Sequence, residues 1–198
     1  YAPTPDVPLA IEVNAVGVAV LQGDATIYEG SATLPELQFL AEQVQGAKNV
    51  CEVGFNAGMS AVAMLHSNPG LKLTSFDIGE WDCVDVAKRY IEERFPGRHK
   101  LVKGNSLETL PKLNGERFDF AFIDGGHSFP VAWSDIRQLA PRSRKLVVDD
   151  STMPGVKTAI EKAVTEGLVT NVEYFDDLSS SDISRRWALM DGILEPGA

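Results

Sequence analysis

Cysteines, basic residues and long apolar runs are scarce in this 198-residue chain, and each shortage excludes a class of protein. Two cysteines cannot make the disulfide framework of a small secreted domain, and we expect Cys51, in a predicted core strand, to be a small buried hydrophobe. The 18 basic against 28 acidic residues leave no basic stripe for a phosphate backbone, so we expect no nucleic-acid partner. No apolar run approaches the length of a membrane span and no secretory signal is visible. We therefore expect no membrane partner and a cytoplasmic location.

The remaining composition is ordinary for a globular protein, with 44% apolar and 23% charged residues. The length suits one α/β domain with a sizeable core and is short for two. The chain begins at Tyr1 rather than Met. We therefore expect it to be trimmed or excised from a longer, multidomain parent, and a homo-oligomer is also open.

Short apolar runs alternate with helix-forming segments along most of the chain. The strands that we expect are 50–53, 71–76, 100–103, 118–123, 145–148, 171–175 and 186–190. The expected helices begin near residue 59 and then cover 82–95, 106–113, 129–139 and 154–167, and a polar turn covers 176–184. Crossovers of this length predict a Rossmann-like α/β fold: a single-domain, doubly wound sheet, mostly parallel with an antiparallel C-terminal strand.

The N-terminal part of the chain has a different pattern. Residues 1–10 carry three prolines and indicate an extended lead-in. Residues 11–29 hold short alternating runs, which favour a small hairpin or an irregular flap. Thr33 is then a predicted N-cap, with Glu36 at the third position of the helix that follows.

A glycine turn joins the first expected strand to the helix that begins near Met59. Gly54 and Gly58 bracket a loop whose backbone must pass close to another group, because glycine lacks the Cβ that would block the approach. Backbone N–H groups at the start of the helix favour an anion. The G-x-G-x-x-G fingerprint and the P-loop sequence are both absent, which disfavours an NAD-dependent oxidoreductase. On this loop alone, a nucleotide cradle and a simple tight turn both stay open.

Acidic or hydrogen-bonding residues close every expected parallel strand, and α/β sheets bind their ligands at these carboxyl ends. Asp77 follows the glycine loop by about twenty residues, where a carboxylate can accept hydrogen bonds from ribose hydroxyls. Asn105 and Ser106 are placed to touch an adenine ring, although Ser106 would serve equally well as a helix N-cap. The strand-end residues are Glu52, Asp77, Asn105, Ser106, Asp124, His127, Asp149 and Asp150.

Three of these residues, Asp124, Asp149 and Asp150, converge at two neighbouring strand ends. Close carboxylates repel one another unless a cation neutralises them. Oxygen ligands suit a hard divalent ion such as Mg²⁺, or else Ca²⁺ or Mn²⁺, so we expect a metal site here. In the alternative interpretation the Asp149–Asp150 pair is an exposed turn, and Asp150 or Ser151 caps the next helix.

Three motifs together carry a resemblance to a known family. The glycine loop reads Glu-x-Gly-x-x-x-Gly, which resembles motif I of the class I S-adenosylmethionine-dependent methyltransferases. With segments 122–127 and 147–155, it looks like the metal-dependent small-molecule O-methyltransferases, such as catechol O-methyltransferase and the macrolide-sugar O-methyltransferases, over about residues 35–165. The resemblance implies that Glu52 attracts the cationic end of the methionine moiety of S-adenosylmethionine and that Ser60 holds its carboxylate.

The same resemblance implies further roles, with two departures from the catechol pattern. Asp77 matches the ribose acid, and the three aspartates at the strand ends match the metal ligands. The catechol enzymes usually have Asn where this chain has Asp150, and a catalytic Lys where it has His127. A histidine accepts a proton near neutral pH, so His127 could act as the base, or it could merely order the loop before Ser128. The expected cofactor-binding residues are Glu52, Gly54, Asn56, Gly58, Ser60, Asp77, Asn105, Ser106 and Asp124, and the expected catalytic residues are His127 and Asp124.

We therefore predict an O-methyltransferase that moves a methyl group from S-adenosylmethionine to a hydroxyl of a small molecule of catechol or vicinal-diol type, assisted by a divalent metal such as Mg²⁺. Residues 35–198 would form the methyltransferase domain, and residues 1–34 would form the lead-in and flap. Two alternatives stay open. One is a metal-independent class I methyltransferase acting on N, C or O, and the other is a non-catalytic S-adenosylmethionine-binding module of a larger assembly.

Overall fold

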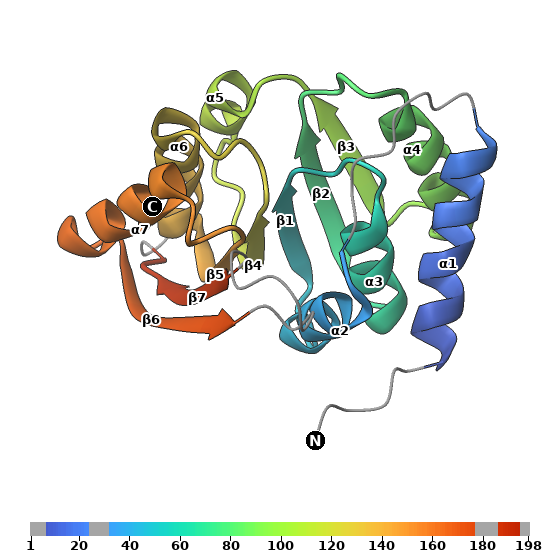
Figure 1. The fold of residues 1–198 in the computed structure, drawn as a ribbon, viewed down its shortest axis with the longest axis horizontal. Helices are drawn as coiled ribbons and strands as arrows, with labels where there is room; N and C mark the ends of the chain where they lie inside the picture. The colour runs from blue at the N-terminus through green and yellow to red at the C-terminus, as the bar shows by residue number, and fades with distance from the viewer. Residues whose placement is uncertain (1–6, 24–31, 177–185, 195–198) are drawn as a thin grey trace.

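One twisted sheet with helices on both faces organises the protein, as the computed structural model shows for residues 7–23, 32–176 and 186–194 (Figure 1). Within these residues seven strands form the sheet in the order β3-β2-β1-β4-β5-β7-β6. The first five strands pair in parallel, whereas β7 runs antiparallel to both β5 and β6. This order confirms the predicted Rossmann-like fold with an antiparallel C-terminal strand. The strands are β1 Asn49–Val53, β2 Lys72–Asp77, β3 His99–Lys103, β4 Phe118–Ile123, β5 Ser143–Val148, β6 Val169–Asp176 and β7 Arg186–Gly192.

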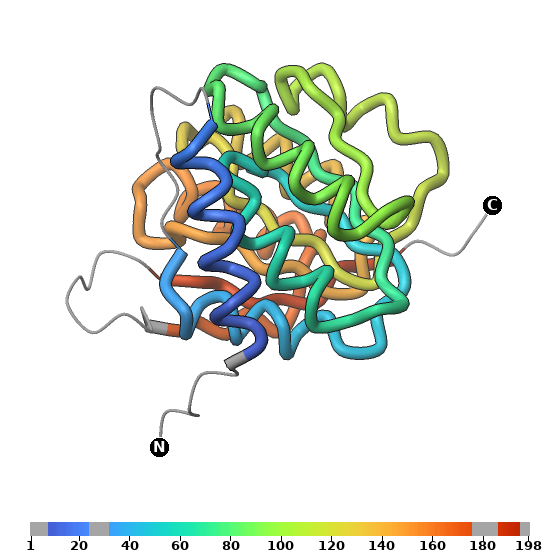
Figure 2. Tube along the Cα trace, turned by 90° about the vertical axis from the view of Figure 1, so that its right-hand side faces the viewer, coloured from blue at the N-terminus to red at the C-terminus, as the bar shows by residue number. Residues whose placement is uncertain are grey.

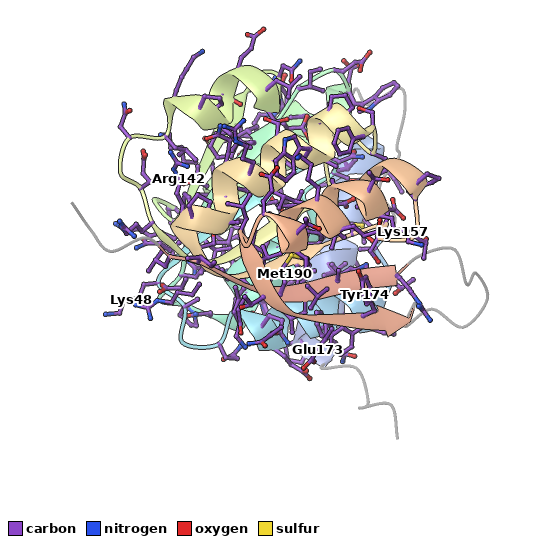
Figure 3. All side chains as sticks on the ribbon, turned by 90° about the vertical axis from the view of Figure 1, so that its left-hand side faces the viewer. Lys48, Arg142, Lys157, Glu173, Tyr174 and Met190 are labelled. Carbon is purple, nitrogen blue, oxygen red and sulfur yellow. The ribbon has the colours of Figure 1, made fainter. Side chains whose placement is uncertain are left out.

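The helices divide into two layers, one on each face of the sheet (Figure 1). Those of the described residues are α1 Val7–Gln22, α2 Leu34–Gln43, α3 Met59–Ser67, α4 Asp82–Arg94, α5 Ser106–Thr109, α6 Phe129–Leu139 and α7 Pro154–Thr165, with short 3₁₀ turns at Leu110–Lys112 and Ala140–Arg142. Figure 2 shows α1 on the outside of the layer that contains α3 and α4, and Figure 3 shows α6 and α7 side by side on the other face. None of the described helices combines the length and the apolar character needed to cross a membrane.

Two apolar cores lie on the two faces, which explains why the central strands are apolar along their whole length. In β4, Phe120 and Phe122 belong to the core under α1 to α4, whereas Ala121 and Ile123 belong to the core under α6 and α7. Cys51 of β1 is fully buried in the second core, as predicted for a small hydrophobe. Because both faces are buried, the register of the strands is strongly specified. The register in turn determines which residues lie at the carboxyl ends of neighbouring strands.

The prediction of a hairpin or flap over 11–29 is wrong for the part that the structure describes. The prediction of an extended lead-in over 1–10 is wrong for residues 7–10. Helix α1 covers both, and residues 24–31 lie outside the described part. The apolar residues of this segment are buried at helical spacing of three or four residues: Leu9, Val13, Val16 and Val20. Arg94 of α4 also holds the helix through an ion pair of 2.6 Å with Glu12. Valine-rich alternation imitated a strand, and Pro8 is tolerated in a first helical turn.

Helix α2 begins where its capping residues predict. The Thr33 hydroxyl accepts a hydrogen bond from the Glu36 backbone N–H at 3.5 Å, and the Glu36 carboxylate accepts one from the Thr33 N–H at 2.6 Å. The pair satisfies two N–H groups that the start of a helix leaves without partners. The expected polar turn over 176–184 lies almost wholly outside the described residues.

We predict that Thr33→Ala lowers the free energy of unfolding by about 1 kcal/mol, because the Glu36 N–H loses its acceptor. Urea unfolding should show a lower midpoint with an unchanged slope. The matched control is Thr165→Ala on the exposed side of α7, where the hydroxyl donates to the Glu161 carbonyl four residues earlier and caps no helix start. A loss of equal size in both variants would contradict the capping role.

Candidate functional site

The glycine loop between β1 and α3 packs against the end of β4. Gly54 has φ +94°, and a Cβ there would lie 1.9 Å from the main-chain oxygen of Asp124. Its N–H donates to the Phe76 carbonyl at 2.8 Å, so it is tied to the end of β2 as well. The close approach expected at this glycine is therefore an approach to the protein's own backbone. This packing at Gly54 brings the ends of β1, β2 and β4 together.

Asp77 holds the glycine loop in shape. One of its carboxylate oxygens accepts the backbone N–H groups of Phe55 and Asn56, both at 2.9 Å, and the other accepts that of Gly79 at 2.7 Å. Asn56 has a left-handed φ of 44°, and its side-chain oxygen accepts a hydrogen bond from the Cys83 thiol at 3.2 Å. A carboxylate offers about four lone-pair positions, so Asp77 keeps capacity for one further donor.

Glu52 is fully buried beneath the loop and accepts two hydroxyl hydrogen bonds. Ser60 donates to one oxygen at 2.5 Å, and Ser75 donates to the other at 2.6 Å. Burial raises the pKa of Glu52 to about 7, although both hydroxyls oppose that rise. Ser75 also lies 3.0 Å from His99, whose pKa burial lowers to about 4. Sequence reasoning missed Ser75, although the parallel register places it directly opposite Glu52.

Two cavities open on either side of the glycine loop, and Gly54, Asn56, Asp124 and Gly125 line both of them. The smaller cavity, of about 340 Å³, includes Asp77, Trp81, Asn105, Ser106, Gly126 and Val131. The larger cavity, of about 530 Å³, includes Glu36, Leu40, Gly58, Ser60, Phe122, His127, Asp149, Asp150 and Trp187. Except for Glu52, which is buried and lines neither cavity, the expected residues divide between two adjoining spaces at the carboxyl ends of the strands.

Asn105, rather than Ser106, caps helix α5. The Asn105 side-chain oxygen accepts the Leu107 N–H at 3.0 Å, and Ser106 is the first helical residue. The alternative in which Ser106 is the N-cap is therefore wrong. Ser106 keeps its hydroxyl for another partner, and it lines the smaller cavity.

The acidic residues of β4 and β5 meet at the larger cavity. Burial raises the pKa of Asp124 well above its usual value, and nearby Asp149 and Asp150 raise it further. Among the described residues, one ligand atom from each of Asp124, His127 and Asp150 lies within 4.8 Å of the others. Asp149 accepts the Asp150 N–H at 2.5 Å and is not part of this compact group.

His127 and Asp150 are in direct contact in this cluster, with 3.0 Å between Nε2 and Oδ2. Neither Asp150 nor Ser151 caps α7: the helix has Met153 at its N-cap, and the Ser151 hydroxyl donates to the Arg186 carbonyl at 2.6 Å. The capping interpretation of Asp150 and Ser151 is therefore wrong. Asp150 has φ 52°, a conformation that costs free energy in a non-glycine residue.

The wall of the larger cavity includes residues that sequence reasoning did not assign to a site. Trp187 of β7 packs against Phe39 and Phe122 with ring centroids 5.5 and 5.4 Å apart. Glu36 reaches the same cavity while it caps α2. The position of β7 next to β5 brings Trp187 here, and a strand order of this kind could not be read from local sequence.

Comparison with known proteins gives a consistent result. A model of the methyltransferase domain family matches residues 51–150. The O-methyltransferase imqG of Aspergillus flavus is 29% identical over 141 residues, which cover 66% of this chain and 57% of that protein. The chain spans about half the length of the curated relatives it matches.

Solved structures share the fold. TomG, an O-methyltransferase from Streptomyces achromogenes solved with S-adenosylmethionine, has a TM-score of 0.75 at 16% identity, covering 91% of this chain and 89% of its own. An O-methyltransferase from Bacillus cereus solved with S-adenosylhomocysteine has a TM-score of 0.71 at 20% identity, covering 96% and 92%.

We predict that Gly54→Ala lowers the free energy of unfolding by about 4 kcal/mol or more, because its Cβ would overlap the Asp124 carbonyl oxygen. The matched control is Gly46→Ala: Gly46 has φ +77°, but nothing lies within 4 Å of an added Cβ. That variant should lose only about 1 to 2 kcal/mol from the left-handed conformation. Equal losses in denaturant unfolding would contradict the role of the close approach.

We also predict that Glu52→Gln removes part of the pH dependence of stability. Glu52 ionises at about 7 in the folded state, against an ordinary value of 4.5, so the folded state binds the extra proton between these pH values. Ionisation of Glu52 should therefore lower wild-type stability by roughly 3 kcal/mol as pH rises through this window. This share of the fall should be absent in Glu52→Gln and present in the exposed control Glu116→Gln. Equal pH profiles in all three proteins would contradict the raised pKa.

Proposed function

The chain belongs to the methyltransferase domain family, and from this premise we propose that it is an S-adenosylmethionine-dependent O-methyltransferase acting on a hydroxyl of a small molecule. One observation carries the proposal: two cavities adjoin at Gly54 and Asp124, one suited to an adenosine and the other lined with acidic groups. The name of the A. flavus relative supports the choice of oxygen as the methyl acceptor.

The cofactor would bind across the glycine loop. The adenosine would occupy the smaller cavity, with one ribose hydroxyl at the remaining position on Asp77 and its adenine near Asn105 and Ser106. The methionine moiety would extend past Gly54 and Gly58, with its ammonium group towards Glu52 and its carboxylate at the backbone N–H groups that begin α3, beside Ser60. Glu52 suits a cation because, among the described residues, the hydrogen-bond donors to its buried carboxylate are two neutral hydroxyls. The methyl group would then face the larger cavity.

The acidic cluster fits a divalent cation. Asp149 and Asp150 raise the electrostatic cost of a charge on Asp124. The ligand atoms of Asp124 and Asp150 lie within 4.8 Å of that of His127. We propose that the three carboxylates hold a hard cation such as Mg²⁺. A cation bound there supplies charge that lowers the pKa of an acceptor hydroxyl and orients it.

The protein's own groups would then position the acceptor and take its proton. His127 lies at the mouth of the larger cavity with 42% of its side chain exposed, and Asp150 at 3.0 Å can orient the ring and stabilise its charged form. The apolar surfaces of Phe122, Leu40 and Trp187 would exclude water from the acceptor. A cavity of about 530 Å³ must hold the methionine moiety as well, so we propose a compact catechol or vicinal diol as acceptor.

A metal-independent transfer is the second candidate function, and the His127–Asp150 contact favours it. An imidazole oriented by a carboxylate is a general base that needs no cation. Chelation separates the two candidates, because it would leave this transfer unchanged.

We predict that methyl transfer to catechols and vicinal diols requires Mg²⁺. EDTA or Asp149→Ala should lower the rate roughly 100-fold or more, while the dissociation constant for S-adenosylhomocysteine changes by less than about three-fold, since the cofactor cavity is intact. The control Asp85→Ala, on the outer side of α4 and paired only with Lys103 among its described contacts, should retain full activity. Full turnover with EDTA would favour the second candidate, and the absence of both turnover and cofactor binding would overturn the proposal.

The role of His127 can be tested in the same assay. If His127 is the base, His127→Ala should lower kcat about 100-fold or more. The affinity for Mn²⁺, measured by its electron paramagnetic resonance signal, should then stay unchanged. A parallel loss of Mn²⁺ affinity would instead identify His127 as a metal ligand, as the compact group with Asp124 and Asp150 would allow.

A further inference from the structure

Asp135 is a fully buried acid in the middle of helix α6, away from the cluster described above. Neither of its carboxylate oxygens has a hydrogen-bond partner of standard geometry in the described part of the chain. A buried carboxyl without a partner is costly, and native proteins seldom keep one without a reason. Sequence reasoning did not single it out.

The Asp135 carboxyl lies directly behind the wall of the smaller cavity. Val131, one helical turn earlier on the same face of α6, lines this cavity. A Cβ added to Gly125, another wall residue, would lie 3.4 Å from Asp135 Oδ2. Helix α5 packs against α6 and lies beside its end (Figure 1).

Ser106 is the side chain that acts on this acid electrostatically. Burial raises the pKa of Asp135 to about 7, and the Ser106 hydroxyl opposes the rise. Ser106 itself lines the smaller cavity and is not used as the cap of α5, as shown above. Its hydroxyl therefore lies between the buried carboxyl on one side and the cavity on the other.

We propose that Asp135 is a positioning residue: its carboxylate accepts the Ser106 hydroxyl hydrogen, so that Ser106 can only accept, and not donate, a hydrogen bond in the cavity. A serine hydroxyl has one hydrogen to donate and two lone pairs. Once the hydrogen is directed to Asp135, only the lone pairs face a bound base. The smaller cavity then selects a purine with a 6-amino group and rejects one with a 6-oxo group.

The selection follows from the pairing of donors with acceptors. The exocyclic amino group of adenine donates, whereas the 6-oxo group of hypoxanthine accepts and would face the Ser106 lone pairs. A site that offers the wrong partner leaves two buried acceptors unsatisfied, which is penalised more than a missing contact. The inference rests on the proposed function, because it places the adenosine of the cofactor in this cavity.

The test is calorimetric titration of S-adenosylhomocysteine and its deaminated analogue S-inosylhomocysteine at pH 8.5. The wild-type protein should prefer the adenine compound by about ten-fold or more. In Asp135→Asn, whose amide can donate to Ser106, the preference should fall to within about three-fold, and Ser106→Ala should show the same loss. The double variant should lose no more than Ser106→Ala alone, because Asp135 acts through that hydroxyl.

Two further measurements keep the test decisive. Thr109→Ala should keep the full preference, because it removes a different hydroxyl of α5, one that donates to the Asn105 carbonyl. Ser106→Ala tests the inference even where Asp135→Asn does not fold. An unchanged preference in Ser106→Ala, or an effect of Asp135→Asn that persists without Ser106, overturns the inference. If S-adenosylhomocysteine does not bind the wild-type protein, the proposed function fails instead.

Discussion

Negative charge is concentrated at one edge of the sheet, and the other features of the site depend on how the protein tolerates it. Burial raises the pKa values of Glu52 and Asp124, and further acids stand next to each of them. Such groups are stable only if they are protonated, or if hydrogen bonds or cations compensate their charge. Serine hydroxyls provide part of the compensation at Glu52. The ammonium and sulfonium groups of the cofactor, and a divalent cation, would supply the rest.

Strand register explains why these groups meet. Val53 pairs with both Phe76 and Ile123, and Ile123 pairs with Val148. The residues one position beyond these partners therefore form a row along the edge: Asp77, Gly54, Asp124 and Asp149. Because Gly54 has no Cβ, the ends of β1 and β4 can pack closely together; any side chain there would overlap the Asp124 carbonyl oxygen. A sheet that buries both faces thus creates the site as a consequence of its own packing.

Much of this arrangement could be predicted from the sequence, since apolar strands, glycine turns and capping residues are local signals. The strand ends and the Thr33–Glu36 capping box belong to this part. Helix α1 could not be recognised because valines repeat in it at a spacing that also suits a strand. Ser75, Asp135 and Trp187 contribute through pairing between distant segments, and no local pattern marks them. The proximity of His127 to Asp150 likewise depends on how two loops pack together.

The protons released on cofactor binding test the central claim most directly. The claim is that Glu52, whose pKa burial raises to about 7, stays partly protonated near neutral pH until a cation reaches it. The number of protons released per bound cofactor can be measured by calorimetric titration of S-adenosylhomocysteine at pH 6.5 with EDTA, repeated in buffers of different ionisation enthalpy. The account predicts a release of roughly half to one proton per cofactor, falling towards zero at pH 8.5, where Glu52 is already ionised. Binding without proton release at pH 6.5 would contradict it.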